Sequence, residues 1–135
     1  MKTYRQTFIY HPRIGYKFLP KLKVTVVGDE KDKMEDYQLV VDKFGYRNDS
    51  EDFLLNNKNF NVDNLFVGCS FTAGDGIKNE SRFTNLIGNS YNAGLSGSCT
   101  IQQLSIAEDC SNFLIPKRVI FSPYIGCLAR ASLSY

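Results

Sequence analysis

The residues best suited to chemistry lie in a run of small side chains at 65–76, which reads LFVGCSFTAGDG. Its first three residues predict a short buried strand, and Ser70 follows in the turn after that strand. Because ligands collect at the carboxyl ends of strands in parallel α/β sheets, we expect the Ser70 hydroxyl to face a cleft. A serine there could attack an acyl carbonyl while backbone N–H groups of the turn stabilise the developing oxyanion.

On its pattern alone, this run fits none of the common catalytic or phosphate-binding motifs. Thr72 occupies the second glycine position of the G-x-S-x-G nucleophile elbow. No Gly-Lys-Ser/Thr follows as a P-loop requires, and residues 74–76 lack the third glycine of a dinucleotide site. Three interpretations therefore stay open: a serine nucleophile, a Ser70 that caps a helix beside turn glycines, and a nucleotide-binding domain that uses residues 74–76 at a helix N-terminus.

Four segments together resemble the SGNH (GDSL-type) hydrolase superfamily. Residues 68–76 match the G-x-S-x-T-x-G-x-G form of its first block, and residues 92–97 (NAGLSG) match the N-x-G-x-x-G of its second, with Gln102 or Gln103 shortly after. Residues 11–16 (HPRIGY) with Pro20, and residues 42–47 (DKFGYR), resemble segments that precede the nucleophile in SGNH-like proteins acting on acylated glycans. The four occur in the family's order and together span residues 11–97, so the resemblance extends over most of the chain.

The resemblance implies a serine ester hydrolase that uses neither cofactor nor metal. Ser70 would be the nucleophile, and its own N–H together with that of Gly97 would donate to the oxyanion. The implied substrate is an acyl or acetyl ester, on a small molecule or on a carbohydrate.

The sequence departs from the family at the third block and at the general base. Gly126 and Cys127 stand where the family's G-x-N-D places Asn and Asp, and loss of one oxyanion donor costs roughly 10²–10³ in rate. The family's Asp-x-x-His is missing, and we do not expect the one histidine, His11, to replace it. We therefore expect weak or no activity from this chain, and the alternative is a non-catalytic SGNH-like module that binds a glycan or a protein.

The first 60 residues predict a β-rich arm made of short extended segments. These segments are 7–10, 22–27 and 37–41, each rich in β-branched or aromatic residues. The charged residues 28–33 between the second and third segments predict a hairpin loop.

Residues 61–135 alternate apolar strands with helical patterns, which is typical of a parallel α/β layer. Strands are predicted at 65–67, 91–93 and 118–122. A helix at 80–88 would bury Phe83, Leu86 and Ile87. A second helix would begin with a capping box of Thr100 and Gln103 and end before Pro116; its predicted apolar face comprises Ile101, Leu104, Ala107, Cys110 and Leu114.

The predicted fold is thus a three-layer, SGNH/flavodoxin-like parallel sheet, preceded by the β-rich arm. Related sheets have about five strands, so we expect a truncated chain. It could be a fragment of a longer gene product, a frameshifted or degenerate remnant, or a shortened protein whose exposed sheet edge is covered by a second copy or another partner.

Composition excludes intrinsic disorder and argues against two kinds of partner. The 135 residues carry 16 basic and 14 acidic side chains, and 43% are hydrophobic. Such a chain can form a core, and without a basic block we expect no nucleic-acid binding. Residues 83–107 are uncharged but too polar for a membrane span, and no apolar signal follows Met1, so we expect a cytoplasmic protein.

The four cysteines, Cys69, Cys99, Cys110 and Cys127, form no C-x-x-C pair. We expect them to be buried thiols and not metal ligands.

Overall fold

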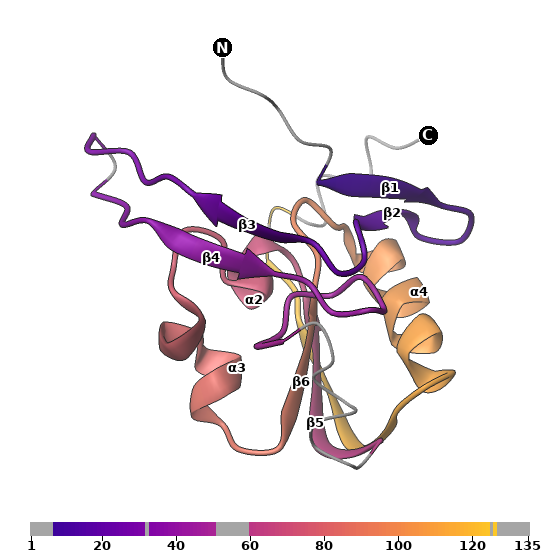
Figure 1. The fold of residues 1–135 in the computed structure, drawn as a ribbon. Helices are drawn as coiled ribbons and strands as arrows, with labels where there is room; N and C mark the ends of the chain where they lie inside the picture. The colour runs from indigo at the N-terminus through magenta and orange to yellow at the C-terminus, as the bar shows by residue number, and fades with distance from the viewer. Residues whose placement is uncertain (1–6, 32, 51–59, 125, 127–135) are drawn as a thin grey trace.

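The structure is a computed structural model that describes residues 7–31, 33–50, 60–124 and 126 (Figure 1). Within these residues the fold is mixed α/β. A three-stranded parallel sheet is flanked by helices and preceded by two antiparallel hairpins.

The parallel sheet has the order β6-β5-β7. The central strand β5 (Asn61–Gly68) pairs with β6 (Ser90–Gly94) on one side and with β7 (Ile115–Ser122) on the other. Residues 64–68 of β5 are all buried, as expected of a strand covered on both faces. The predicted strands at 65–67, 91–93 and 118–122 lie within these three, and their order is confirmed.

The two crossovers run on opposite faces of the sheet (Figure 1). The chain leaves β5 through α2 (Ser70–Ala73), η1 (Asn79–Ser81) and α3 (Phe83–Leu86) before it forms β6. It then crosses to the far side of β5 through α4 (Thr100–Ser111) and forms β7. The strand β5, first of the three along the chain, therefore lies in the middle of the sheet. Its carboxyl end is the point where the strand order reverses, because one crossover leads to β6 on one side and the next leads to β7 on the other.

The single helix predicted at 80–88 is wrong. An extended residue, Arg82 (φ −67°, ψ 134°), separates η1 from α3. The Arg82 side chain is buried and donates to the Arg47 carbonyl oxygen at 2.7 Å and to Asp49 at 2.9 Å. Because these polar contacts occupy the buried side of the segment, Phe83, Leu86 and Ile87 are all exposed.

The helix predicted from Thr100 is confirmed, but its cap, its end and its buried face differ. The N-cap is Cys99, whose N–H donates to the Gln102 side chain at 2.9 Å, so the capping box is shifted by one residue. The helix ends at Ser111, and Pro116 lies within β7. Its buried residues are Gln103, Ile106 and Cys110, whereas Ile101 and Leu104 are exposed.

The arm forms two hairpins. One pairs β1 (Phe8–His11) with β2 (Gly15–Phe18), and the other pairs β3 (Lys23–Val26) with β4 (Tyr37–Val40). The predicted segments at 7–10, 22–27 and 37–41 match three of these strands, and β2 was missed. The predicted loop at 28–33 joins β3 to β4, with residue 32 outside the described residues.

Arm and sheet share one hydrophobic core. The arm contributes Ile14, Phe18, Leu39, Val41 and Tyr46, and the sheet and α4 contribute Leu65, Val67, Tyr91, Ile106 and Cys110. The arm is therefore packed as part of the same folding unit as the parallel sheet, across the boundary expected near residue 60.

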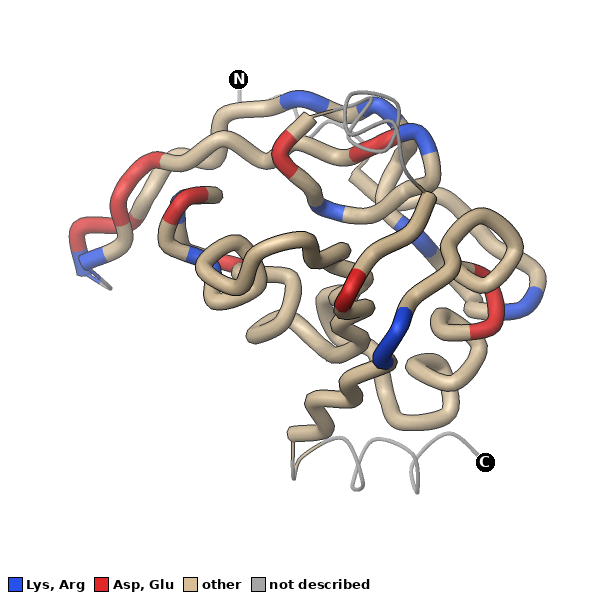
Figure 2. The backbone as a smooth tube through the Cα atoms, turned by 90° about the horizontal axis from the view of Figure 1, so that it is seen from below, with Lys and Arg blue, Asp and Glu red and all other residues tan. Residues whose placement is uncertain are grey.

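Charged residues are interspersed along the described backbone in Figure 2. Among the described helices, the longest has 12 residues, and none is long and apolar enough to cross a membrane.

Candidate active site

The carboxyl ends of the three parallel strands meet in one row. Gly68 of β5 pairs with Gly94 of β6 on one side and with Ser122 of β7 on the other. Ser70 lies two residues beyond Gly68, at the first position of α2, and is half-buried. The predicted nucleophile therefore lies at the carboxyl end of the central strand, where the strand order of the sheet reverses.

Glycine is required where β6 ends against α2. A Cβ atom on Gly94 would lie 2.6 Å from the carbonyl carbon of Thr72, 2.8 Å from the Cα of Ala73 and closer still to the Ala73 nitrogen. Only a hydrogen at this position lets the strand touch the helix backbone. The first glycine of the NAGLSG segment therefore sets the distance between β6 and the Ser70 helix.

Asn92 fixes the same contact through hydrogen bonds. Its buried side-chain nitrogen donates to the Thr72 carbonyl oxygen at 2.8 Å, and its side-chain oxygen accepts from the Gly94 N–H at 2.8 Å. One amide thus satisfies a helix carbonyl and a strand-end donor that are both buried. The sequence motif contained Asn92, but the pattern assigned it no role.

Arg47 fixes the segment that follows α2. Its guanidinium, fully buried, donates to the carbonyl oxygens of Ala73 at 3.2 Å, of Gly74, and of Ile77 at 2.7 Å. The ring of Tyr37 lies 4.7 Å from the guanidinium carbon. The arm's DKFGYR segment thereby positions the loop behind Ser70, a role that no local sequence signal revealed.

The loop after β6 carries Gly97 to the same edge of the sheet as Ser70. The N–H of Leu95 donates to the Gly68 carbonyl oxygen at 2.9 Å, and the Ser98 hydroxyl donates to the same oxygen at 3.1 Å. Gly97 has φ +79°, a conformation that favours glycine. The Tyr16 hydroxyl donates to the neighbouring Ser96 carbonyl oxygen at 2.6 Å, so the arm also supports this loop.

The two predicted oxyanion donors are the N–H groups of Ser70 and Gly97. Among the described residues, neither N–H donates a hydrogen bond to another protein group. The structure brings these groups to neighbouring loops at one edge of the sheet.

No described histidine or carboxylate forms a hydrogen bond with the Ser70 hydroxyl. His11 accepts from the Ile14 N–H through Nδ1 at 3.2 Å, and its Nε2 lies 3.6 Å from Asp109. Burial, and the charge of Lys17, lower the pKa of His11, with Asp109 opposing them. His11 therefore contacts its own hairpin and Asp109 of α4, and among the described residues it forms no hydrogen bond with Ser70.

The carboxylate at the edge of the site is Asp75, which pairs with a different serine. The Ser96 hydroxyl donates to Asp75 at 2.5 Å. Burial raises the pKa of Asp75, although this hydrogen bond and the charge of Arg47 lower it. The pair links the loop after α2 to the loop after β6.

The segment after β7 approaches α2 through aromatic rings. The Phe71 and Tyr124 ring centroids lie 5.5 Å apart. Of the two residues expected at the third block of the resemblance, Gly126 is described, and Cys127 lies outside the described residues.

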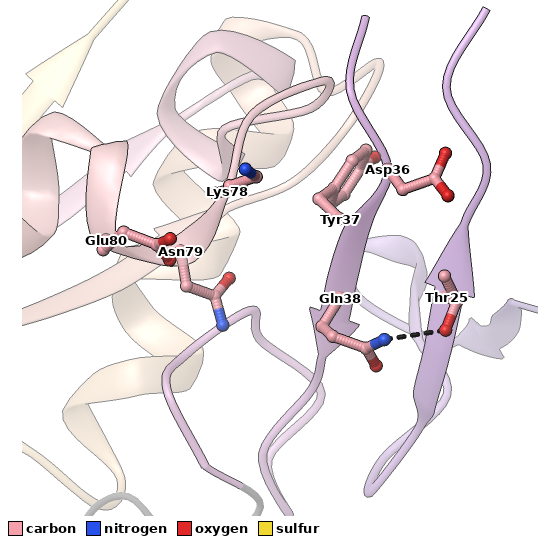
Figure 3. A pocket seen from close by; sticks show the side chains of 7 residues that line it. All are labelled: Thr25, Asp36, Tyr37, Gln38, Lys78, Asn79 and Glu80. Carbon is pink, nitrogen blue, oxygen red and sulfur yellow. Dashed lines mark hydrogen bonds between the residues drawn. The ribbon is translucent and has the colours of Figure 1, made fainter.

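A polar pocket lies away from Ser70, between the β3–β4 hairpin and η1 (Figure 3). The Gln38 amide donates to the Thr25 hydroxyl at 2.7 Å along one wall. None of the predicted site residues lines it; its lining consists of Thr25, Asp36, Tyr37, Gln38, Lys78, Asn79 and Glu80.

Cys69, Cys99 and Cys110 are buried free thiols, as predicted, and Cys127 falls outside the described part of the chain. Within that part, no group of three or more His, Cys, Asp or Glu residues could hold a metal ion.

Comparisons with known proteins leave the family open. No protein-family model, no curated protein and no solved structure matches the chain.

Proposed function

We propose that the chain is part of an SGNH-type serine ester hydrolase with the superfamily's flavodoxin-like sheet. The observation that carries the proposal is the position of Ser70 at the carboxyl end of the central strand of the β6-β5-β7 sheet. In open α/β sheets this reversal of strand order is where ligands bind. The hydroxyl makes no hydrogen bond to another described residue, so it is free to react.

In the proposed reaction, Ser70 Oγ attacks the carbonyl carbon of the ester. The N–H groups of Ser70 and Gly97 donate to the oxyanion of the tetrahedral intermediate. Collapse of the intermediate expels the alcohol and leaves an acyl group on Ser70, which water then hydrolyses to the free acid. The serine proton passes to solvent unless a base is supplied from outside the described residues.

The substrate class rests on the resemblance alone. Its segments at 11–16 and 42–47 favour an acyl or acetyl ester on a carbohydrate. In this structure those segments position the loops around Ser70, through Tyr16 and Arg47.

An esterase assay tests the nucleophile. With p-nitrophenyl acetate, we expect the wild-type chain to release p-nitrophenol faster than Ser70→Ala and at the rate of a matched control, Ser122→Ala. General-base assistance contributes about 10²–10⁴ in rate, so turnover should be slow. Equal release by Ser70→Ala and wild type, with both chains folded by circular dichroism, would remove Ser70 from the mechanism.

The second candidate is a non-catalytic SGNH-like module that binds a glycan or a protein. The position of His11 favours it, because this histidine lies against Ile14 and Asp109 and no described histidine forms a hydrogen bond with Ser70. An acetylated xylo-oligosaccharide that raises the melting temperature equally in wild type and Ser70→Ala, without release of acetate, would support the module over the enzyme.

A further inference from the structure

The polar pocket between the β3–β4 hairpin and η1 lies between two walls that other contacts hold in place. Its volume of about 220 Å³ is below the ~300–1,000 Å³ of sites for drug-sized ligands, so it suits a ligand of about one ring. The η1 wall is anchored to the arm, because the Asn79 side-chain oxygen accepts from Arg47 Nη2 at 3.1 Å. The ion pair of Lys78 with Glu35, at 2.6 Å, joins η1 to the hairpin.

The hairpin wall presents unpaired backbone groups of β4. The Val41 N–H donates to the Leu22 carbonyl oxygen at 2.8 Å, so residue 41 directs its backbone groups toward the chain that forms β3. Alternation along the register then directs the N–H and C=O of Gln38 away from β3. Figure 3 shows η1 on that side of β4. Within the described chain these two groups have no hydrogen-bond partner, so the pocket holds one free backbone donor and one free acceptor.

Side chains add further donors and acceptors to the pocket. Asn79 extends from η1 toward β4 (Figure 3), and because its oxygen accepts from Arg47, its amide N–H groups are left to donate. One carboxylate oxygen of Asp36 accepts from the Gly28 N–H at 2.8 Å, which leaves the other oxygen for a ligand. Glu80 supplies a second carboxylate. Donors and acceptors therefore surround a space of about one ring.

The lining favours a neutral, hydrogen-bonding ligand. Asp36 and Glu80 are acidic, and the charge of Lys78 is matched by Glu35, so an anion is disfavoured. A cation could pair with the carboxylates, but it would leave the N–H groups of Gln38 and Asn79 directed at a positive charge. The described lining contains no aliphatic side chain to reward an apolar ligand.

We propose that this pocket binds one neutral sugar ring through the Gln38 backbone and the Asn79 amide. A sugar hydroxyl both donates and accepts, so adjacent hydroxyls can accept from these N–H groups and donate to the Gln38 carbonyl or to a carboxylate. The pocket contains neither Ser70 nor Gly97, so it holds a glycan without cleaving it. The inference goes beyond the proposed reaction and does not depend on Ser70 being a nucleophile.

Titration of the ¹⁵N-labelled full chain with glucose tests the site. In heteronuclear NMR spectra we expect saturable shifts of the Gln38 backbone N–H and the Asn79 side-chain amide, with a Kd on the order of 1–10 mM. Ser70→Ala should bind glucose as wild type does, which separates this site from the proposed reaction. The absence of saturable shifts at Gln38 and Asn79, or saturable shifts confined to residues around Ser70, would overturn the proposal.

Asn79→Asp tests the contact, because the variant keeps an oxygen for Arg47 and loses the amide donors. Loss of one hydrogen bond should weaken glucose binding about three- to tenfold. The control Asn61→Asp, at the exposed start of β5, introduces the same charge outside the pocket and should bind glucose as wild type does. Equal glucose binding by the two folded variants would refute the proposal. Shifts of the same signals by the dication putrescine, without shifts by glucose, would refute it as well.

Discussion

Replacing Gly94 with alanine should disrupt the contact between β6 and the Ser70 helix. The added Cβ would lie 2.6 Å from the Thr72 carbonyl carbon and 2.8 Å from the Ala73 Cα, whereas real Cβ atoms essentially never approach another atom closer than 3.0 Å. Both neighbours are backbone atoms, so no side-chain rotation can relieve the overlap. Asn92 ties the Thr72 carbonyl to the same strand, which prevents α2 from simply moving away.

The expected cost is at least that of overpacking a well-packed core, about 1–3 kcal/mol, because both elements must shift. Gly88→Ala is the matched control, since no atom lies within 4 Å of a Cβ at that position. Urea unfolding followed by circular dichroism should show Gly94→Ala losing at least about 1 kcal/mol relative to Gly88→Ala. A difference below about 0.5 kcal/mol would refute the argument that this glycine sets the spacing.

Three further predictions concern the buried polar groups and thiols. Asn92→Ala should lower the free energy of unfolding by about 2–4 kcal/mol, measured in urea, because it leaves a buried carbonyl and a buried N–H unpaired. The control is Asn61→Ala, at the exposed start of β5, and a loss for Asn92→Ala no larger than for this control would contradict the prediction. Burial raises the pKa of Asp42, so its contribution to stability is complete below pH ~4 and is lost as the pH rises through the folded-state pKa. The stability difference between wild type and Asp42→Asn should therefore shift against wild type as the pH rises above ~4, and parallel curves would show the sign to be wrong. The buried thiols Cys69, Cys99 and Cys110 should resist alkylation until the chain unfolds, as mapped by mass spectrometry, and rapid native labelling of any of them would contradict their burial.

Local sequence signals predicted the strands of the sheet because each is a short apolar or β-branched run. Residues 65–67 are buried on both faces and form an uninterrupted apolar run, which is typical of a strand in a parallel sheet. The strand β2 was missed because Gly15 and Lys17 interrupt its apolar pattern. In the structure the Lys17 ammonium is paired with Asp109 at 2.8 Å, which satisfies an otherwise costly buried charge.

The helix at 80–88 shows where such signals fail. Phe83, Leu86 and Ile87 have the spacing of a buried helical face, yet all three are exposed and the buried side chains in this segment are Arg82 and Thr84. The partners of Arg82 include Arg47 and Asp49, more than 30 positions earlier. No local pattern could reveal hydrogen bonds formed at that separation.

In the candidate site, too, the sequence predicted the feature that depends on local residues and missed the contacts between distant ones. The strand-to-turn pattern predicted the position of Ser70, since the end of a parallel strand is a local feature. The residues that position its helix, Arg47 and Asn92, act on carbonyl groups 26 and 20 positions away and were recognisable only as members of motifs. The change of composition near residue 60 indicated a boundary between arm and sheet. It did not predict that residues from both sides of this boundary pack in one hydrophobic core.

Identifying the acylated residue is the most direct measurement of whether Ser70 is a nucleophile. The full chain is incubated with p-nitrophenyl acetate, quenched in acid, digested and mapped by tandem mass spectrometry. The proposed mechanism predicts an acetyl group on Ser70 that appears with the release of p-nitrophenol and is absent from Ser70→Ala. Acetylation confined to lysines or other serines, at the same level in both chains, would contradict it.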